Sequence, residues 1–229
     1  EEVEKLTVVL TKGGLLKTFK DHLQEDKVKN NIGEFISLHK ILSNQKLLLF
    51  VSSGRVYTLD PKILPSGKSN PKSFIYFVES NSNEEIVNIL PYEKKLKIIV
   101  ASYYGKGFIA DLEEIITSQK KGKQLFNLKN NDKLHCISSI IDEYIACVSS
   151  KSKLLVFKTN ELPTLKKGGG VQLQKIKKDD NLSDIQIFNL SNGLNWQLGK
   201  QTRNEKNLDF WIGKRAQSGK KVPKRFNKN

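Results

Sequence analysis

The chain has 229 residues, of which 39 are Lys or Arg and 24 are Asp or Glu, a formal net charge of +15, and none is Met, so we expect a piece of a longer protein. Hydrophobic residues (38%) and charged residues (28%) occur at ordinary globular levels and there are only two cysteines, which excludes a disordered tail and a disulfide-dense mini-protein. The strongest apolar runs, Leu47 to Val51 and Ile98 to Ala101, are far shorter than the ~20 residues of a membrane helix and no signal peptide opens the sequence, so one or two soluble domains are expected.

In chain order, five segments share one form, in which an apolar strand meets a turn of small residues and a second strand follows. They are LTVVLTKGGLLKTF (6–19), LLLFVSSGRVYTL (47–59), LKIIVASYYGKGFIADL (96–112), YIACVSSKSKLLVF (144–157) and IQIFNLSNGLNWQL (185–198). The turns are predicted at Gly13-Gly14, Ser53-Gly54, Tyr104-Gly105, Lys151-Ser152 and Asn192-Gly193. Most of them contain Gly or Asn, which supply the positive φ that tight turns require. Each segment is therefore predicted to be a β-hairpin, in a repeat of about 45 residues, the usual length of a propeller blade.

A basic loop rich in Lys and Gly follows four of these hairpins. These loops are ILPSGKSNPKS (63–73), IITSQKKGKQL (115–125), LPTLKKGGGVQ (162–172) and GKRAQSGKKVPKR (213–225). A further strand follows two of them, at 124–128 and 171–176, so each repeat provides about four strands. The pattern predicts one all-β domain over 1–229, a propeller-like array of about five four-stranded blades starting near residues 6, 47, 96, 144 and 185. A β-sandwich or barrel would also show short strands, but neither predicts a basic loop at a fixed phase.

The excess of positive charge indicates a polyanionic partner, with nucleic acid ahead of an anionic membrane surface. Lysine dominates, since Arg occurs only at 55, 203, 215 and 225. Because Lys lacks the planar fork that reads guanine edges, we expect contacts to duplex phosphates that do not depend on sequence. Loop glycines would let the backbone approach the phosphates, and several such contacts would offset the about 1–6 kcal/mol needed to bend 20–30 base pairs.

The blade segments carry a family resemblance, in order along nearly the whole chain. GRVYTLDPKILPSG (54–67), YGKGFIADLEEIITSQKKGKQLFNL (104–128), ELPTLKKGGG (161–170), LGKQTRN (198–204) and GKRAQSGKKVPKR (213–225) resemble the C-terminal domains of bacterial type IIA topoisomerase A subunits, in particular the DNA topoisomerase IV (ParC) branch. The resemblance implies a β-pinwheel, with strand exchange between blades, that binds and bends duplex DNA to present the transported segment for decatenation, relaxation and chromosome segregation.

The same resemblance implies the rest of the system. The catalytic Tyr would lie outside this chain, which would itself need no cofactor. The parent enzyme, an isomerase using ATP and Mg, would pair an A-subunit dimer with an ATPase B subunit (ParE-like) in the bacterial cytoplasm, associated with the nucleoid. No membrane is expected, although ParC-type proteins can associate with one. The related gyrase box, Gln-Arg/Lys-Arg-Gly-Gly-Lys/Arg-Gly, is incomplete here, at Gln119 to Lys123 and at Lys166 to Gly170, which favours topoisomerase IV over gyrase wrapping.

The expected DNA contacts are the basic residues of these loops and hairpins. They are Arg55, Lys68, Lys72, Lys106, Lys120, Lys121, Lys123, Lys166, Lys167, Lys200, Arg203, Lys214 and Arg215.

Residues 200–229 carry over half of the net charge, ten Lys or Arg against two acidic residues. This basic closing segment has two possible arrangements: it completes the fifth blade up to about Arg225, or it is partly disordered and adds only non-specific attraction.

Catalysis has little support within the chain. His22, His39 and His135 show no metal-ligand spacing, and Cys136 and Cys147 lie on apolar strands as buried structural thiols would. The remaining alternative is a protein-interaction β-propeller, which would bind peptides on its faces with little dependence on salt. Trp196 and Trp211 are expected to pack in or between blades.

Overall fold

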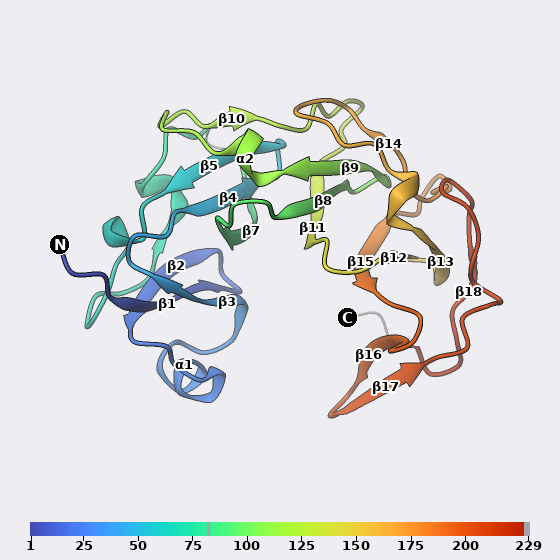
Figure 1. Cartoon of the computed structure of the whole chain (residues 1–229), viewed down its shortest axis with the longest axis horizontal. Coiled ribbons are helices and arrows are strands. Elements are labelled where there is room, and N and C mark those ends of the chain that lie inside the picture. The colour runs from blue at the N-terminus through green and yellow to red at the C-terminus, as the bar shows by residue number, and fades with distance from the viewer. Residues whose placement is uncertain (82, 227–229) are drawn as a thin grey trace. The chain divides into compact units, whose positions relative to one another are not determined.

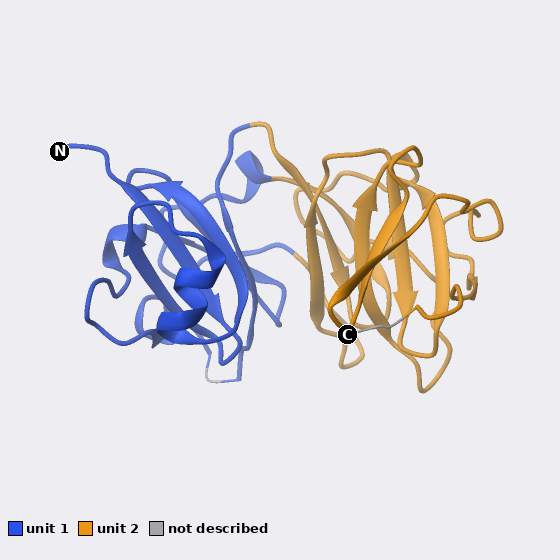
Figure 2. Ribbon diagram, turned by 90° about the horizontal axis from the view of Figure 1, so that it is seen from below, with its two compact units in different colours: residues 1–94, 112–125 blue, residues 95–111, 126–229 orange. Residues whose placement is uncertain are grey.

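The computed structural model describes residues 1–81 and 83–226 and divides into two compact units (Figure 2). Unit 1 comprises residues 1–94 and 112–125, and unit 2 comprises residues 95–111 and 126–229. Every sheet lies within one unit, so each unit can be described by itself.

Unit 1 contains two four-stranded antiparallel sheets, in the orders β3-β1-β2-β6 and β10-β5-β4-β7. The strands of the first sheet are β1 (Lys5–Thr11), β2 (Leu15–Lys20), β3 (Phe35–Leu42) and β6 (Lys72–Ser73). Those of the second are β4 (Leu47–Val51), β5 (Arg55–Leu59), β7 (Ile86–Pro91) and β10 (Lys123–Gln124). Short helices join them: α1 (Glu25–Ile32), α2 (Leu112–Ile115), η1 (Pro61–Ile63) and η2 (Phe74–Tyr76).

Unit 2 contains two more four-stranded sheets, in the orders β11-β8-β9-β14 and β15-β12-β13-β18, and one two-stranded sheet, β16-β17. The third blade is made of β8 (Lys97–Ser102), β9 (Lys106–Asp111), β11 (Leu134–Ser139) and β14 (Val171–Gln172). The fourth is made of β12 (Tyr144–Ser149), β13 (Lys153–Lys158), β15 (Leu182–Phe188) and β18 (Lys220–Lys221), with η3 (Thr159–Glu161) after β13. The fifth hairpin is β16 (Leu194–Leu198) and β17 (Gln201–Glu205).

Each four-stranded blade is completed by a strand that the chain adds only after it has built the next hairpin. Thus β6 follows β5 but pairs with β2, β10 follows β9 but pairs with β5, and β14 follows β13 but pairs with β9 (Figure 1). The last case is β18, which follows the fifth hairpin and pairs with β13. This strand exchange confirms the predicted all-β, pinwheel-like fold, and we call β6, β10, β14 and β18 the closing strands.

The hairpin turns explain why small residues recur. The amides of Gly14, Gly54, Gly105 and Ser152 donate to the carbonyls three residues before them at 3.0 Å, and all four residues have positive φ. A β-bulge lies at the same place in each four-stranded sheet, where the first hairpin strand meets its other neighbour. The first four predicted hairpins are therefore present at the predicted turns.

The fifth predicted hairpin, over 185–198, is wrong. Residues 182–188 form β15, which pairs with β12 of the fourth blade, and the Asn192-Gly193 turn leads away from that sheet. The fifth hairpin begins at Leu194 and turns at Gly199, and it has two strands instead of the predicted four. Both Asn192-Gly193 and Gly199 have turn-forming residues, and the local sequence pattern does not distinguish the turn that joins two paired strands.

Within the described residues the basic closing segment contributes to two blades, because its first strand, β17, forms the fifth hairpin with β16. Its second strand, β18, completes the fourth blade, and the Trp211 carbonyl accepts a 3.0 Å hydrogen bond from the Val156 N–H of β13. Beyond β18, Phe226 packs against Trp196 of the fifth hairpin, with ring centroids 5.0 Å apart. Residues 227–229 of the segment lie outside the described part.

The core of each unit lies between its sheets. Apolar side chains from both sheets of unit 1 form one cluster, and side chains from the third and fourth blades, including Cys136 and Cys147, form another in unit 2. Helix α1, which the strand-based prediction did not include, covers the first sheet by placing Val28 against Val9 and Phe19.

Candidate nucleic-acid interface

The net charge is divided unequally between the units. Unit 1 holds 16 Lys or Arg against 14 Asp or Glu, a net +2, whereas unit 2 holds 23 against 10, a net +13. A polyanion is therefore attracted chiefly to unit 2, whichever individual residues it contacts.

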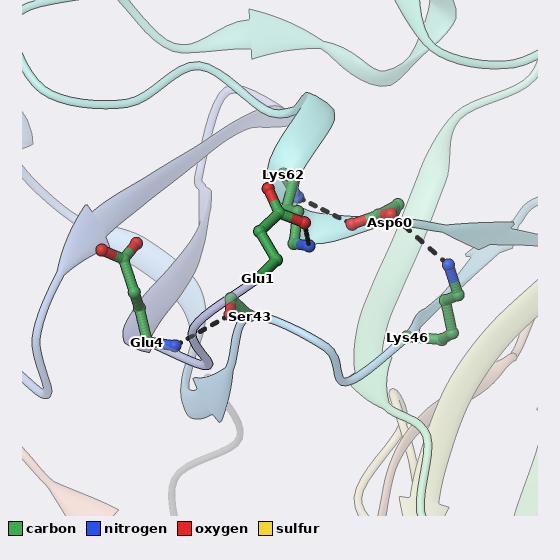
Figure 3. Close-up of polar contacts among 6 residues, drawn as sticks. All are labelled: Glu1, Glu4, Ser43, Lys46, Asp60 and Lys62. Atoms are coloured by element: carbon green, nitrogen blue, oxygen red, sulfur yellow. Dashed lines mark hydrogen bonds and ion pairs between the residues drawn. The ribbon is translucent and has the colours of Figure 1, made fainter.

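Part of the positive charge of unit 1 is neutralised locally. The Lys62 ammonium lies 2.8 Å from a Glu1 carboxylate oxygen, and Lys46 lies 3.4 Å from Asp60 (Figure 3). Asp60 also accepts the backbone N–H of Lys62 at 3.0 Å. Its pKa is lowered, because this hydrogen bond and the two lysines outweigh the opposing effect of desolvation, which is the largest single contribution. Exposed ion pairs of this kind contribute little stability, but they reduce the attraction for an outside anion.

The thirteen predicted DNA-contacting residues are divided between the two units. Six lie in unit 1 and seven in unit 2. All ten lysines among them are exposed, whereas Arg55, Arg203 and Arg215 are half-buried.

Two of these arginines, Arg55 and Arg215, are used within the fold. Arg55 donates from Nε to the Lys121 carbonyl at 2.6 Å, which holds the basic loop before β10 against β5. Arg215 donates from Nη1 to the Gln172 carbonyl at 2.9 Å and so ties the last loop to β14. Lys123 likewise donates to the Glu114 carbonyl at 2.5 Å. These three side chains position basic loops, and the exposed lysines around them are the better candidates for phosphate.

The loop glycines have a structural role that the sequence interpretation did not anticipate. Gly122 and Gly170 precede β10 and β14, have φ of 69° and 70°, and cross the hairpin strand so closely that a Cβ would lie 2.5 Å from the carbonyl oxygens of Val56 and Gly107. Gly219 precedes β18 in the same way. The glycines therefore let the closing strand approach the protein's own backbone, which accounts for their recurrence without any phosphate.

Three exposed lysines outside the predicted set lie beside a groove of unit 2. Lys175, Lys177 and Lys178 line it together with Tyr103 and Tyr104 of the third-blade turn. The sequence signal, KIKKDD at 175–180, was weakened by its two aspartates. One of them, Asp180, is buried, and its carboxylate accepts the Lys151 N–H of the turn between β12 and β13 at 2.9 Å.

Among the groups considered for catalysis, the two cysteines are buried and His39 and His135 are half-buried. Burial raises the pKa of the Cys136 and Cys147 thiols and lowers the pKa of His39 and His135. Among residues 1–81 and 83–226, no three His, Cys, Asp or Glu side chains are grouped to hold a metal ion. In the same part of the chain, no helix is both long enough and apolar enough to cross a membrane.

Comparison with known proteins gives concordant results. The model of the family "DNA gyrase C-terminal domain, beta-propeller" matches residues 98–136 and 143–189. The A subunit of DNA topoisomerase 4 from Rickettsia bellii (strain RML369-C) is 34% identical over 99% of this chain and 31% of that protein, and its counterpart in Rickettsia conorii (strain ATCC VR-613 / Malish 7) is 35% identical over the same shares. The chain thus spans about a third of the length of these relatives.

Solved structures show the same fold. The E. coli ParC C-terminal domain matches with a TM-score of 0.80 and 24% identity, over 96% of this chain and 95% of that one. A DNA gyrase A C-terminal domain matches with a TM-score of 0.67 and 19% identity, over 97% of this chain and 80% of that one.

Proposed function

Because the chain belongs to the family of C-terminal domains of bacterial DNA gyrase and DNA topoisomerase IV A subunits, we propose that it is a non-catalytic domain that binds and bends duplex DNA for a topoisomerase IV. The observation that carries the proposal is the net +13 of unit 2, borne largely by exposed lysines. Such a surface neutralises phosphates and releases counterions regardless of base sequence. Curving the duplex brings more phosphates to more lysines and so offsets the cost of bending.

The proposal extends to the parent enzyme. The domain would hold the duplex segment that the enzyme transports, while strand cleavage takes place elsewhere in the longer protein. Its partners would be the other A chain of the dimer and the ATPase component, with ATP and Mg used there and not in this domain. The similarity to A subunits of DNA topoisomerase 4 supports a role in unlinking and relaxing DNA over a role in gyrase-type supercoiling. A supercoiling assay on the reconstituted enzyme tests this choice, and introduction of negative supercoils would contradict it.

Duplex binding is tested on the chain itself. A labelled 25-base-pair duplex of random sequence should bind at low salt, and the logarithm of its affinity should fall linearly with the logarithm of salt concentration by about 0.9 for each phosphate contact. Energy transfer between dyes on the two duplex ends should rise on binding, because bending shortens the end-to-end distance. No binding at low salt would overturn the proposal, and binding with unchanged energy transfer would remove bending from it.

A pair of matched double variants tests the lysine loops. Replacing the exposed Lys120 and Lys121 by Ala should flatten the salt dependence by about two contacts if both ammonium groups reach phosphate. The control is the double Ala variant of Lys46 and Lys62, which loses the same charge from residues already paired with Asp60 and Glu1. Equal slopes in the two variants would exclude this loop from the interface.

A further inference from the structure

One position in the blades is basic in three successive hairpins. It is the first residue of the second hairpin strand, and the closing strand places its own second residue directly opposite. The facing pairs are Arg55 with Gln124, Lys106 with Gln172, and Lys153 with Lys221.

In the second and third blades a neutral amide faces the basic residue. Gln124 donates from Nε2 to the Ser53 carbonyl at 3.0 Å, and its Oε1 accepts from Arg55 Nη1 at 3.3 Å. Gln172 makes the equivalent bond to the Tyr104 carbonyl at 2.9 Å. The amide thus links the closing strand to the hairpin turn.

The fourth blade places a second lysine where these glutamines stand. The N–H of Val222 donates to the Ser152 carbonyl at 3.0 Å, so the neighbouring pair, Lys153 and Lys221, occupies a non-hydrogen-bonded position of the antiparallel ladder. At such a position the two side chains lie on one face with Cβ atoms about 4.5–5.5 Å apart. Both lysines are exposed. Neither ammonium forms an ion pair with a described residue, and two ammonium groups cannot hydrogen-bond each other.

Like charges directly opposite in a sheet are unfavourable. The adjoining turn contacts one buried carboxylate, Asp180, which accepts the Lys151 N–H, and two further lysines lie nearby. Lys151 is exposed in the adjoining turn, and Lys220, next to Lys221, places its ammonium 4.2 Å from the centre of the Phe210 ring. Lys221 itself is fixed in place, because its carbonyl accepts a 2.8 Å hydrogen bond from Trp211 Nε1. The result is a strand edge on which two exposed, facing lysines have no ion-pair partner among the described residues.

We propose that Lys153 and Lys221 form a phosphate-binding pair that grips the backbone of the DNA duplex at the closing edge of the fourth blade. The inference rests on the proposed function and makes it specific to one site. Each of the two ammonium groups on this face can neutralise one phosphate of the DNA backbone, and the bound phosphates remove the repulsion between the lysines. A glutamine at either position would leave the edge with one ammonium, as in the third blade.

The test is Lys221→Gln, which installs the residue found in the second and third blades and so should fold. The matched control is Lys158→Gln, which removes the same charge from the exposed far end of the same sheet, on β13. Salt-dependent binding of the labelled duplex is measured for both variants, and their thermal midpoints are measured without DNA. The tryptophans report unit 2, where both lie.

Lys221→Gln should flatten the salt slope by about 0.9, so its loss of affinity relative to the wild type should be about eightfold greater at 0.1 M salt than at 1 M. Lys158→Gln should change the slope less. Without DNA, Lys221→Gln should raise the midpoint at low salt, and the rise should disappear near 1 M salt, where the Debye length is about 3 Å. Equal slopes in the two variants, with the wild type binding normally, would overturn the paired site and leave the proposed function standing. Failure of the wild type to bind would overturn both.

Discussion

Replacing Gly219 by Ala tests whether the loop glycines serve the closing strands. Gly219 has a φ of 79°, and an added Cβ would meet the Leu154 carbonyl oxygen directly, with the carbonyl carbon at 2.7 Å. These neighbours are backbone atoms of β13, so no side-chain rotation can relieve the contact. The strand β18 would have to move away from β13.

The expected loss of stability has two parts. A left-handed conformation costs Ala roughly 1–2 kcal/mol. Forcing atoms into an occupied space adds about 1–3 kcal/mol, which brings the total to about 2–5 kcal/mol. For a unit of this size each kcal/mol lowers the thermal midpoint by about 4 °C.

Gly199→Ala separates the two parts. Gly199 also lies in unit 2 and has a φ of 61°, but a Cβ there would find no atom within 4 Å. It should therefore lose only the conformational part, roughly 1–2 kcal/mol. Urea unfolding followed by tryptophan fluorescence measures both variants, because Trp211 bonds to the Lys221 carbonyl in β18 and Trp196 lies in the fifth hairpin. Equal midpoints for the two variants would refute the close-approach explanation.

Two further predictions concern buried titratable groups. Burial lowers the pKa of His39 from 6.5 and outweighs the 2.8 Å hydrogen bond between its Nε2 and the Ile89 carbonyl, which raises the pKa, so the neutral form is favoured in the fold. Stability should therefore be complete above about pH 6.5 and fall as the pH drops below it, and His39→Gln should flatten this dependence in urea unfolding followed by circular dichroism; parallel pH profiles would contradict the assignment. Burial raises the pKa of Cys136 and Cys147, so neither thiol should react with a colorimetric thiol reagent at pH 8 until urea is added, and a rapid native reaction would show that the pair is accessible.

Local sequence was sufficient to predict the first four hairpins. Their turns depend on short-range steric requirements, such as the positive φ of Gly54 and Gly105, which a sequence displays directly. The strand exchange was implied only by family resemblance, because β14 and β18 are two residues long and gain their strand character from a partner 60 or more residues away. The same limit explains the misplaced fifth hairpin, where β15 pairs with β12 instead of with the segment that follows it.

The candidate interface was predicted less well for a related reason. Exposure of the ten lysines follows from their residue type, but the pairing of Lys153 with Lys221 depends on register between distant strands. Likewise, separating the basic residues 200–229 from the rest of the sequence does not give the charges of the two units. Residues 112–125 join unit 1 only because β10 returns to β5.

The Lys and the Gly residues recur in the loops for two independent reasons. Gly stands before three of the four closing strands, where the close approach to a carbonyl requires it, and Pro71 stands before the other. The next residue is Lys72, Lys123, Val171 or Lys220, so lysine is not required for the strand to close. The regular spacing of the loops is therefore a property of the fold. The proposed attraction for DNA depends instead on charge that the fold does not neutralise, such as the net +13 of unit 2 and the two lysines that face each other in its fourth blade.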